Sequence, residues 1–370
     1  MPAFEFQLKP AAQPLTDAWR QMPVAPRHGA LLGLSFRPLQ AAAFGLDEHS
    51  ALQALLAYPF QLIRLGAYWN RIEPEPGAFQ VAELDWEIEA AEQAGKQIIL
   101  CLGPIKTFGY PEFFVPAHHL PRPLPEHTRI TPRAHPALIR AATAFLTRLV
   151  ARYRGRSCIV AWQLEHEAVD PLGVEHSWRL DQAFVARELA AVRQADVARP
   201  VLLNGFLPTS LAVRLSQGWG TRDQGDSLAV AQRLADLVGI DFYPRHALLA
   251  VGGQTLYLDG SRSAWQRNKR QALLAWASAH GKKLLITEGQ AEPWEAVTTP
   301  PSPANQGMAS CLPEHVISNY NDCLAAAGAP AGLYAYLFWG AEYWLLRQQA
   351  GDASYLQAFA RVLELSEEPG

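Results

Sequence analysis

The chain has 370 residues, 49% of them hydrophobic and 18% charged, with a formal net charge of −3. This is a globular composition with enough apolar residues for a large core, and neither the net charge nor any basic stripe indicates a nucleic-acid partner. Because the sequence has no apolar run of about 18 residues and no signal-like N-terminus, we expect a cytoplasmic protein without a membrane partner. Four cysteines without CxxC spacing argue against a disulfide scaffold. The sequence gives no indication of the oligomeric state.

Short apolar runs alternate with helical patterns along most of the chain. Residues 1–28 are proline-rich and weakly patterned, and we expect them to be a lead-in that packs on a catalytic domain at 29–370. Alternation of strands and helices predicts a parallel sheet, and eight such units predict a single-domain (β/α)8 TIM barrel of the α/β class. The expected strands are at 30–36, 61–66, 97–102, the first half of 158–167, 200–204, 237–243, 283–289 and 333–339.

Two of the apolar runs lead to glutamates. Residues 159–161 show no polar alternation, which is typical of a strand covered on both faces, and the run continues to Glu167. The seventh run ends at Glu288. Since a barrel builds its active site at the carboxyl ends of its strands, we predict that these two acids face each other across the mouth. Arg64 is a charge within an apolar strand that needs an acidic partner, and we expect it beside Glu288.

A long segment at 103–133 is rich in proline and aromatic residues and contains His118 and His119. Loops of this length in a compact domain are usually functional. Two adjacent histidines suggest a metal, but no cysteine, aspartate or further histidine lies at ligand spacing, so we expect no metal and no cofactor. The sequence also lacks a glycine-rich phosphate loop and a Gly-x-Ser-x-Gly esterase motif.

The ordered residues at the strand ends resemble those of the retaining glycoside hydrolases of clan A, which include cellulases, β-mannanases, β-glucosidases and β-galactosidases. The similar features are the Trp162-Gln163 pair before the fourth-strand acid, Arg64 in strand two, Tyr243 at the end of strand six and Trp339 at the end of strand eight. The resemblance extends from the first predicted strand to the eighth.

This resemblance implies a hydrolase that retains the configuration of the anomeric carbon, with Glu167 as acid/base and Glu288 as nucleophile. Tyr243 would donate a hydrogen bond to Glu288 and orient it. The implied substrate is a β-linked oligosaccharide or glycoside. The residues expected to contact it or to orient the groups that do are Arg64, His166, Tyr243, Trp339 and Trp69.

One position departs from the clan, because His166 stands where most members have an asparagine that contacts the sugar 2-hydroxyl. Some β-mannanases look like this sequence here, which favours β-mannosides over β-glucosides or β-galactosides. Several alternatives remain open: Glu165 could be the acid, Glu288 and Arg64 could form a structural ion pair, and Trp339 could belong to the core. At the level of function, the alternatives are a non-catalytic carbohydrate-binding barrel and a barrel with unrelated chemistry.

Overall fold

The protein is a closed barrel of eight strands with flanking helices. The computed structural model describes residues 5–170, 176–209, 211–221, 224–261, 263–297, 302–326 and 332–367. The strands follow one another around the ring in the order β10, β13, β15, β3, β4, β5, β7 and β9, which confirms the predicted (β/α)8 barrel. Their bounds are β3 (Leu31–Ser35), β4 (Leu62–Gly66), β5 (Gln97–Cys101), β7 (Ile159–Gln163), β9 (Val201–Phe206), β10 (Leu237–Phe242), β13 (Lys283–Gln290) and β15 (Ala335–Trp339).

Burial explains why the barrel strands lack polar alternation. Every residue of β4, β9, β10 and β15 is buried. A barrel strand turns one face to the packed interior and the other to the surrounding helices, so both faces select apolar side chains. The eight mainly apolar runs therefore predicted the strand positions to within a few residues.

The chain divides into two compact units, and each contributes strands to the ring. The first unit comprises Met1–Gln61, Leu207–Arg214 and Asp241–Gly370, and the second comprises Leu62–Phe206 and Leu215–Ile240.

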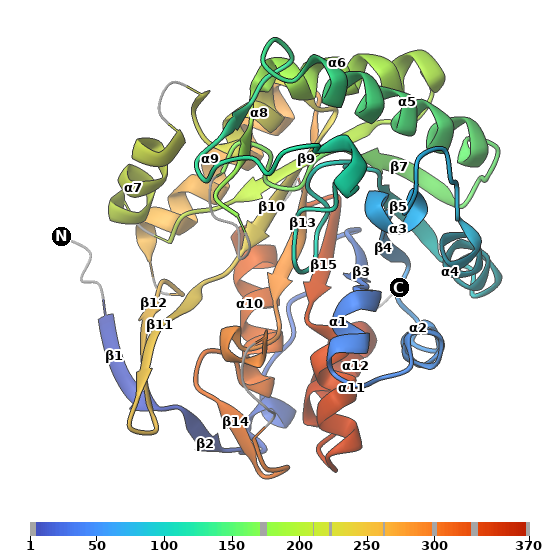
Figure 1. Ribbon diagram of the computed structural model, residues 1–370. Coiled ribbons are helices and arrows are strands. Elements are labelled where there is room, and N and C mark those ends of the chain that lie inside the picture. The colour runs from blue at the N-terminus through green and yellow to red at the C-terminus, as the bar shows by residue number, and fades with distance from the viewer. Residues whose placement is uncertain are drawn as a thin grey trace. The chain divides into compact units, whose positions relative to one another are not determined.

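In the first unit, a small antiparallel sheet accompanies the barrel strands. β11 (Arg245–Val251) and β12 (Gln254–Asp259) form a hairpin, and β1 (Glu5–Pro10) pairs with β12, as Figure 1 shows. A second pair joins β2 (Ala12–Pro14) to β14 (Gln306–Met308). The lead-in predicted at 1–28 thus contains β-strands, while its boundary at residue 28 stays a prediction.

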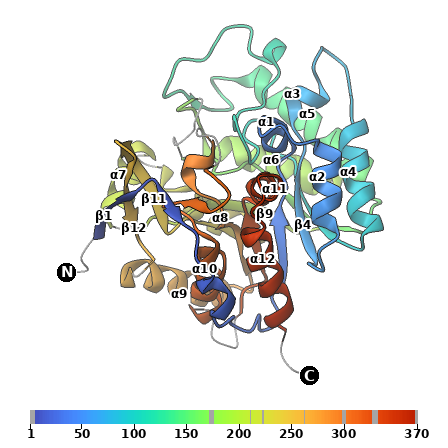
Figure 2. The ribbon, with the colours of Figure 1, turned by 90° about the horizontal axis from the view of Figure 1, so that it is seen from below.

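The helices of the first unit pack on its strands and on each other. Helices α10 and α12 are neighbours, as are α11 and α12 (Figure 2). Helix α12 buries Tyr355, Phe359 and Val362 along one stripe, which is the helical spacing of a core-facing side. The bounds are α1 (Pro38–Ala43), α2 (Glu48–Leu56), α9 (Ala264–Ala279), α10 (Pro313–Ala326), α11 (Ala341–Gln349) and α12 (Ser354–Leu365), with 3₁₀ turns η1 (Ala18–Gln21) and η4 (Trp294–Val297).

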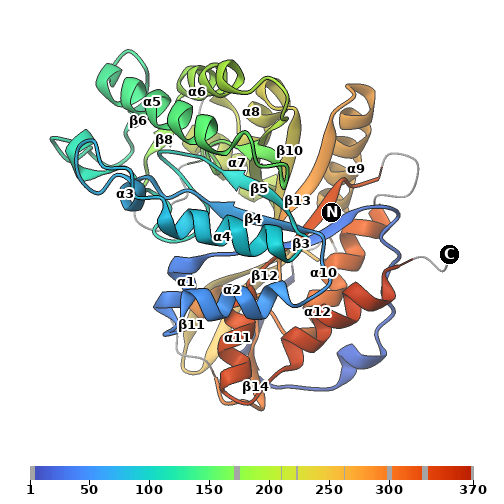
Figure 3. The ribbon, with the colours of Figure 1, turned by 90° about the vertical axis from the view of Figure 1, so that its right-hand side faces the viewer.

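In the second unit, α4 runs along β4 and β5 (Figure 3), and α5 packs against α6. The core-facing stripe of α5 is buried at Leu138, Phe145 and Leu149. The bounds are α3 (Trp69–Ile72), α4 (Ala82–Gln93), α5 (Pro136–Tyr153), α6 (Gln182–Ala195), α8 (Ser227–Leu234), the short strands β6 (Arg129–Ile130) and β8 (Arg179–Leu180), and the 3₁₀ turn η2 (Ala117–His119); α7 (Leu211–Thr221) has residues in both units. Within the described part of the chain, none of the helices has the length and apolar character needed to span a membrane.

Candidate active site

Glu288 lies on β13 at a break in the sheet ladder. The parallel pairing with β15 shifts register between Ile286 and Gly289, which places Glu288 in a bulge. Bulges change the direction of a side chain and are common next to active sites. Glu288 is only 2% exposed, and Tyr243 Oη donates a hydrogen bond of 2.5 Å to its Oε2. The contact expected from Tyr243 is therefore present, and it fixes the orientation of the carboxylate.

Trp339 ends β15 and rests on a buried ion triad. The guanidinium of Arg37 lies 4.2 Å from the centre of the Trp339 ring. Glu292 accepts from Arg37 at 2.7 and 2.8 Å, and Glu342 accepts from the same guanidinium at 2.6 and 2.9 Å. Burial by itself would lower the pKa of Arg37, but the two acids raise it well above its ordinary value. The triad thus places a permanent cation under the ring.

Glu167 lies beyond the end of β7, in a turn with an unusual backbone conformation. Its φ is 43°, in the left-handed region that costs a non-glycine residue about 1–2 kcal/mol. Lys106 holds the turn: its Nζ donates to the carbonyl oxygens of Glu167 at 3.1 Å and Asp170 at 3.4 Å, and its own carbonyl accepts from the N–H of His166 at 2.9 Å. Glu167 is partly exposed. A strained backbone at a partly exposed acid is typical of functional positions.

A chain of hydrogen bonds determines which nitrogen of His166 carries the proton. Arg64 can only donate, and its Nε donates to Gln163 Oε1 at 2.7 Å. The amide nitrogen of Gln163 then donates to Asn204 Oδ1 at 3.0 Å, which leaves Asn204 Nδ2 to donate to His166 Nδ1 at 2.9 Å. Burial, followed by the charges of Arg64 and Lys106, lowers the pKa of His166 well below its ordinary value. The ring is therefore neutral, with its proton on Nε2.

Glu165, the alternative acid, faces the interior. It is fully buried, and its carboxylate accepts from the backbone N–H groups of Ile105 at 3.1 Å and Lys106 at 2.5 Å. Burial, and then the charge of Glu165, raises the pKa of the fully buried Glu188 well above its ordinary value. Burial also raises the pKa of Glu165, to about 7. This acid pair supports the turn that carries Glu167.

Trp69, which the sequence predicted to contact substrate, is fully buried. Its ring stacks on Phe145 with the centroids 5.2 Å apart, and its indole N–H donates to Glu73 Oε2 at 2.7 Å. The ring and its polar group are thus both used within the protein, and the expected sugar contact has no support. The first position of α3 turns this side chain inward, where it anchors α3 to α5.

Sequence reasoning gave no role to several side chains that hold the site. Arg37 lies two residues after the end of β3, and Asn204 lies in β9, so both stood at informative strand positions. Glu292 lies shortly after Glu288 and was overlooked beside it. Nothing in the local sequence distinguishes Lys106 from a surface lysine, although it is fully buried.

The two candidate catalytic acids belong to different units, Glu288 to the first and Glu167 to the second. The predicted meeting of their carboxylates stays a prediction, as does the predicted position of Arg64 beside Glu288.

Comparison with known families supports the sequence resemblance. Residues 57–194, which contain β4, β5, β7 and Glu167, match the family described as β-galactosidase (Glyco_hydro_42). The matched region is less than half of the chain. Among proteins of curated function, none matches this sequence.

Solved structures share the fold at low sequence identity. GH5_18 from Streptomyces cattleya, in complex with Manβ1-4GlcNAc, is 17% identical over 92% of this chain and 82% of its own, with a TM-score of 0.59. Native xylanase 10B from Thermotoga maritima is 14% identical over 86% of both chains, with a TM-score of 0.52. The exo-β-1,4-mannosidase Op5Man5 from Opitutaceae bacterium strain TAV5 is 14% identical over 95% of this chain and 62% of its own, with a TM-score of 0.55. The family match and the shared barrel fold confirm the resemblance to clan A glycoside hydrolases without singling out one family.

Proposed function

We propose that the chain is a retaining β-glycoside hydrolase with Glu288 as nucleophile and Glu167 as acid/base. The observation that carries this proposal is the contrast between the two acids. Glu288 is buried in a bulge and held by Tyr243, whereas Glu167 is partly exposed in a left-handed turn. A retaining mechanism needs this difference, because one carboxylate must stay ionised and fixed while the other exchanges protons.

The reaction has two steps. Glu288 attacks the anomeric carbon while Glu167 protonates the leaving oxygen, which gives a covalent glycosyl-enzyme and releases the aglycone. Glu167, now ionised, takes a proton from water, and the water attacks the anomeric carbon and frees Glu288. The two carboxyl groups of such a pair stand about 5 Å apart.

The proposed substrate is a β-mannoside, and His166 is the proposed reader of its 2-hydroxyl. Because His166 Nδ1 accepts from Asn204, its Nε2–H is the donor that the ring can offer to a sugar oxygen. Arg64 then acts through Gln163 and Asn204 to keep this tautomer. The names of two structural neighbours, one solved with Manβ1-4GlcNAc and one an exo-β-1,4-mannosidase, agree with this choice, while the matched family is described as β-galactosidase.

Trp339 is the proposed platform for the apolar face of the sugar. Its ring is held from one side by Arg37, so its orientation is set before substrate binds.

The proposed location is the cytoplasm. All four cysteines lie within the described residues and are free thiols. Free thiols are the usual state of cysteine in a reducing compartment. To test this location, the protein is exported to the periplasm or secreted, and its thiols are compared with those of protein from a cytosolic extract. Disulfide-linked species in the exported protein, and none in the cytosolic extract, would agree with a cytoplasmic location.

The proposal is tested with nitrophenyl β-glycosides and two variants. The wild type should hydrolyse the β-mannoside faster than its C2 and C4 epimers, with retention seen by NMR of the first product. Glu288→Gln should lose roughly 10⁴-fold or more of kcat, the scale seen when a catalytic nucleophile is removed. Azide should restore turnover to Glu167→Ala by forming a β-glycosyl azide, but not to Glu288→Gln.

A 2-deoxy-2-fluoro mannosyl fluoride provides an independent check of the nucleophile. Peptide mass spectrometry should find the label on Glu288. Full activity of Glu288→Gln, or a label elsewhere, would reject the assignment. Saturable sugar binding without hydrolysis of any β-linked substrate would instead support the carbohydrate-binding barrel.

A further inference from the structure

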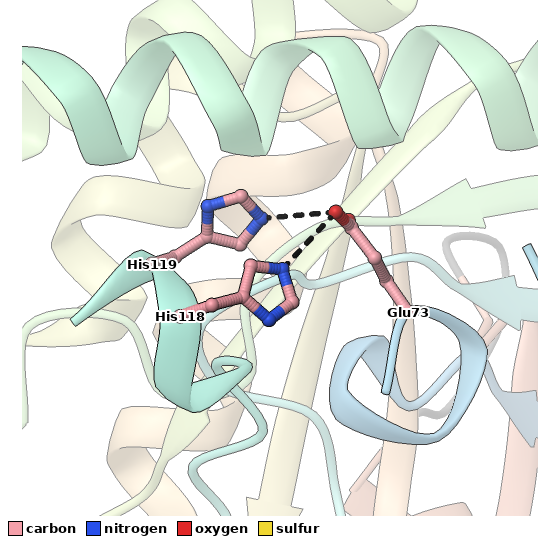
Figure 4. Close-up of side chains that lie close together, drawn as sticks. All are labelled: Glu73, His118 and His119. Carbon is pink, nitrogen blue, oxygen red and sulfur yellow. Dashed lines mark hydrogen bonds and ion pairs between the residues drawn. The ribbon is translucent and has the colours of Figure 1, made fainter. Parts of the chain in front are cut away.

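Three potential metal ligands, none of them assigned to catalysis, converge in the second unit. Glu73 directly follows α3, while His118 and His119 lie in η2, within the long segment 103–133. The Nε2 atoms of both histidines lie 3.2 Å from the same oxygen, Glu73 Oε1. Figure 4 shows the two imidazole rings directed at this oxygen from one side. All three ligand atoms lie within 4.8 Å of one another.

The carboxylate is held so that one oxygen faces the histidines. Glu73 Oε2 accepts the indole N–H of Trp69 at 2.7 Å, which leaves Oε1 for the two imidazoles. Trp69 itself is locked by stacking on Phe145, and the His119 ring lies 4.7 Å from the Trp69 ring. Metal ligands are typically oriented by such an outer hydrogen bond. Trp69 therefore provides the hydrogen bond that would orient Glu73 as a metal-binding carboxylate.

The spacing of the ligand atoms suits a small divalent ion. Two ligands at about 2.0–2.2 Å from a tetrahedral zinc lie roughly 3.3 Å apart, close to the two observed separations of 3.2 Å. About a fifth of each side chain is exposed, 18% for Glu73, 21% for His118 and 22% for His119. An ion can therefore enter from solvent and complete its coordination with water.

We propose that Glu73, His118 and His119 form a binding site for a divalent first-row transition metal, with zinc as the best match to two imidazoles and one carboxylate. The bound ion ties segment 103–133 to the chain after α3, and so fixes a long loop that has few regular elements of its own. This site does not depend on the proposed hydrolase activity. The proposal revises the expectation that the protein binds no metal, because the third ligand, Glu73, comes from a distant part of the sequence.

The test uses metal-free protein and two ions. Isothermal titration with Zn²⁺ should show one saturable site, and Co²⁺ should give visible d–d absorption that Zn²⁺ abolishes. Glu73→Gln and the double variant His118→Ala/His119→Ala should lose both signals. Trp69→Phe keeps a stacking ring but removes the outer hydrogen bond, so its affinity should fall by roughly 10-fold or more. Circular dichroism checks that each variant is folded.

A matched control is available in the same unit. His176 Nδ1 lies 2.8 Å from Glu126 Oε1, a histidine–carboxylate pair with a single histidine. His176→Ala should leave zinc affinity and the Co²⁺ spectrum unchanged.

Limited proteolysis tests separately whether the bound ion fixes segment 103–133. Zinc should slow cleavage within 103–133 in the wild type and not in the double variant. Absence of saturable zinc binding and of Co²⁺ absorption in the wild type would overturn the proposal. So would unchanged zinc affinity in the double variant, because zinc would then be bound elsewhere.

Discussion

The surroundings of Glu288 and of Glu167 differ in almost every respect. Glu288 lies in a strand, is 2% exposed, and is fixed by a hydrogen bond from Tyr243. Glu167 lies in a turn with φ at 43°, is partly exposed, and is held through its backbone by Lys106. In one region a hydrogen bond from Tyr243 orients the carboxylate itself, and in the other Lys106 holds the backbone that carries the carboxylate. A nucleophile needs the first arrangement, and a group that exchanges protons with water needs the second.

The supports under the two acids differ in the same way. The first unit places a permanent ion triad of Arg37, Glu292 and Glu342 below Trp339. The second unit uses a buried pair of acids, Glu165 and Glu188, both with raised pKa values, to support the turn of Glu167. Burial raises the pKa of both acids in the second support, to about 7 for Glu165, so this support responds to pH near neutrality.

The largest expected effect concerns the ion triad. Arg37→Met leaves two carboxylates buried without their cation, so the free energy of unfolding should fall by about 3–5 kcal/mol. Urea unfolding followed by fluorescence measures this change. The control is Arg20→Met, which removes an exposed pair with Asp17 and should change stability by less than about 1 kcal/mol. Equal effects of the two substitutions would show that the triad adds no more than a surface pair.

The next effect separates positioning of Glu288 from its chemistry. Tyr243→Phe removes the donor to Glu288 while keeping the ring that packs 4.8 Å from Trp294. Loss of a hydrogen bond to a charged group costs roughly 1.5–3 kcal/mol, so kcat should fall by about 10- to 100-fold. Tyr334→Phe, at the residue before β15, is the control and should keep full activity. An unchanged kcat in Tyr243→Phe would show that the hydroxyl of Tyr243 has no role in catalysis.

The acid pair predicts a pH dependence of stability. The folded pKa of Glu188 is raised well above its ordinary value, and that of Glu165 to about 7, so the folded state binds more protons than the unfolded state above pH 4–5. Their contribution is complete below the unfolded pKa values and is lost as the pH rises through the folded ones. The free energy of unfolding should therefore fall by about 2 kcal/mol between pH 5 and 8.

Glu188→Gln should flatten this dependence, since it removes one of the two titrating carboxyl groups and with it the charge that raises the pKa of the other. Urea unfolding at several pH values measures it. Glu126→Gln is the control: hydrogen bonds from Ser177 and from His176 lower the pKa of Glu126 to about 2, so this acid does not titrate in the same window. If the free energy of unfolding changed with pH in the same way in wild type and Glu188→Gln, the folded pair would not bind more protons than the unfolded chain.

The sequence predicted the barrel because its strands are constrained on both faces. The sequence did not predict the small antiparallel sheet of β1, β11 and β12, whose position depends on a few residues. The β11–β12 hairpin turns at Gly252 and Gly253, with φ of 58° and 77°, a Gly-Gly signal that fits a two-residue turn and was overlooked. The strand β1 could not be foreseen, because its partner lies more than two hundred residues away.

Site residues were predictable where a strand end marks them and not where a tertiary contact does. Glu288, Glu167 and Tyr243 follow apolar runs and could be named from the sequence. Trp69 also follows a strand, but the short helix α3 begins there and turns the ring inward. Glu73 gave no signal as a partner of the two histidines, since spacing along the chain does not report where α3 and η2 meet.

The smallest expected effect tests the backbone of Glu167 directly. Asparagine is the non-glycine residue best suited to left-handed φ, so Glu167→Asn should relieve strain and raise the free energy of unfolding by roughly 0.5–1 kcal/mol while abolishing hydrolysis. Glu288→Gln should also abolish hydrolysis, but without this gain, because Glu288 is not among the residues with positive φ. Thermal unfolding of the two variants beside the wild type measures the difference. If Glu167→Asn were destabilised as much as Glu288→Gln, the turn would be no more strained than the strand, and conformational cost would no longer distinguish the acid/base from the nucleophile.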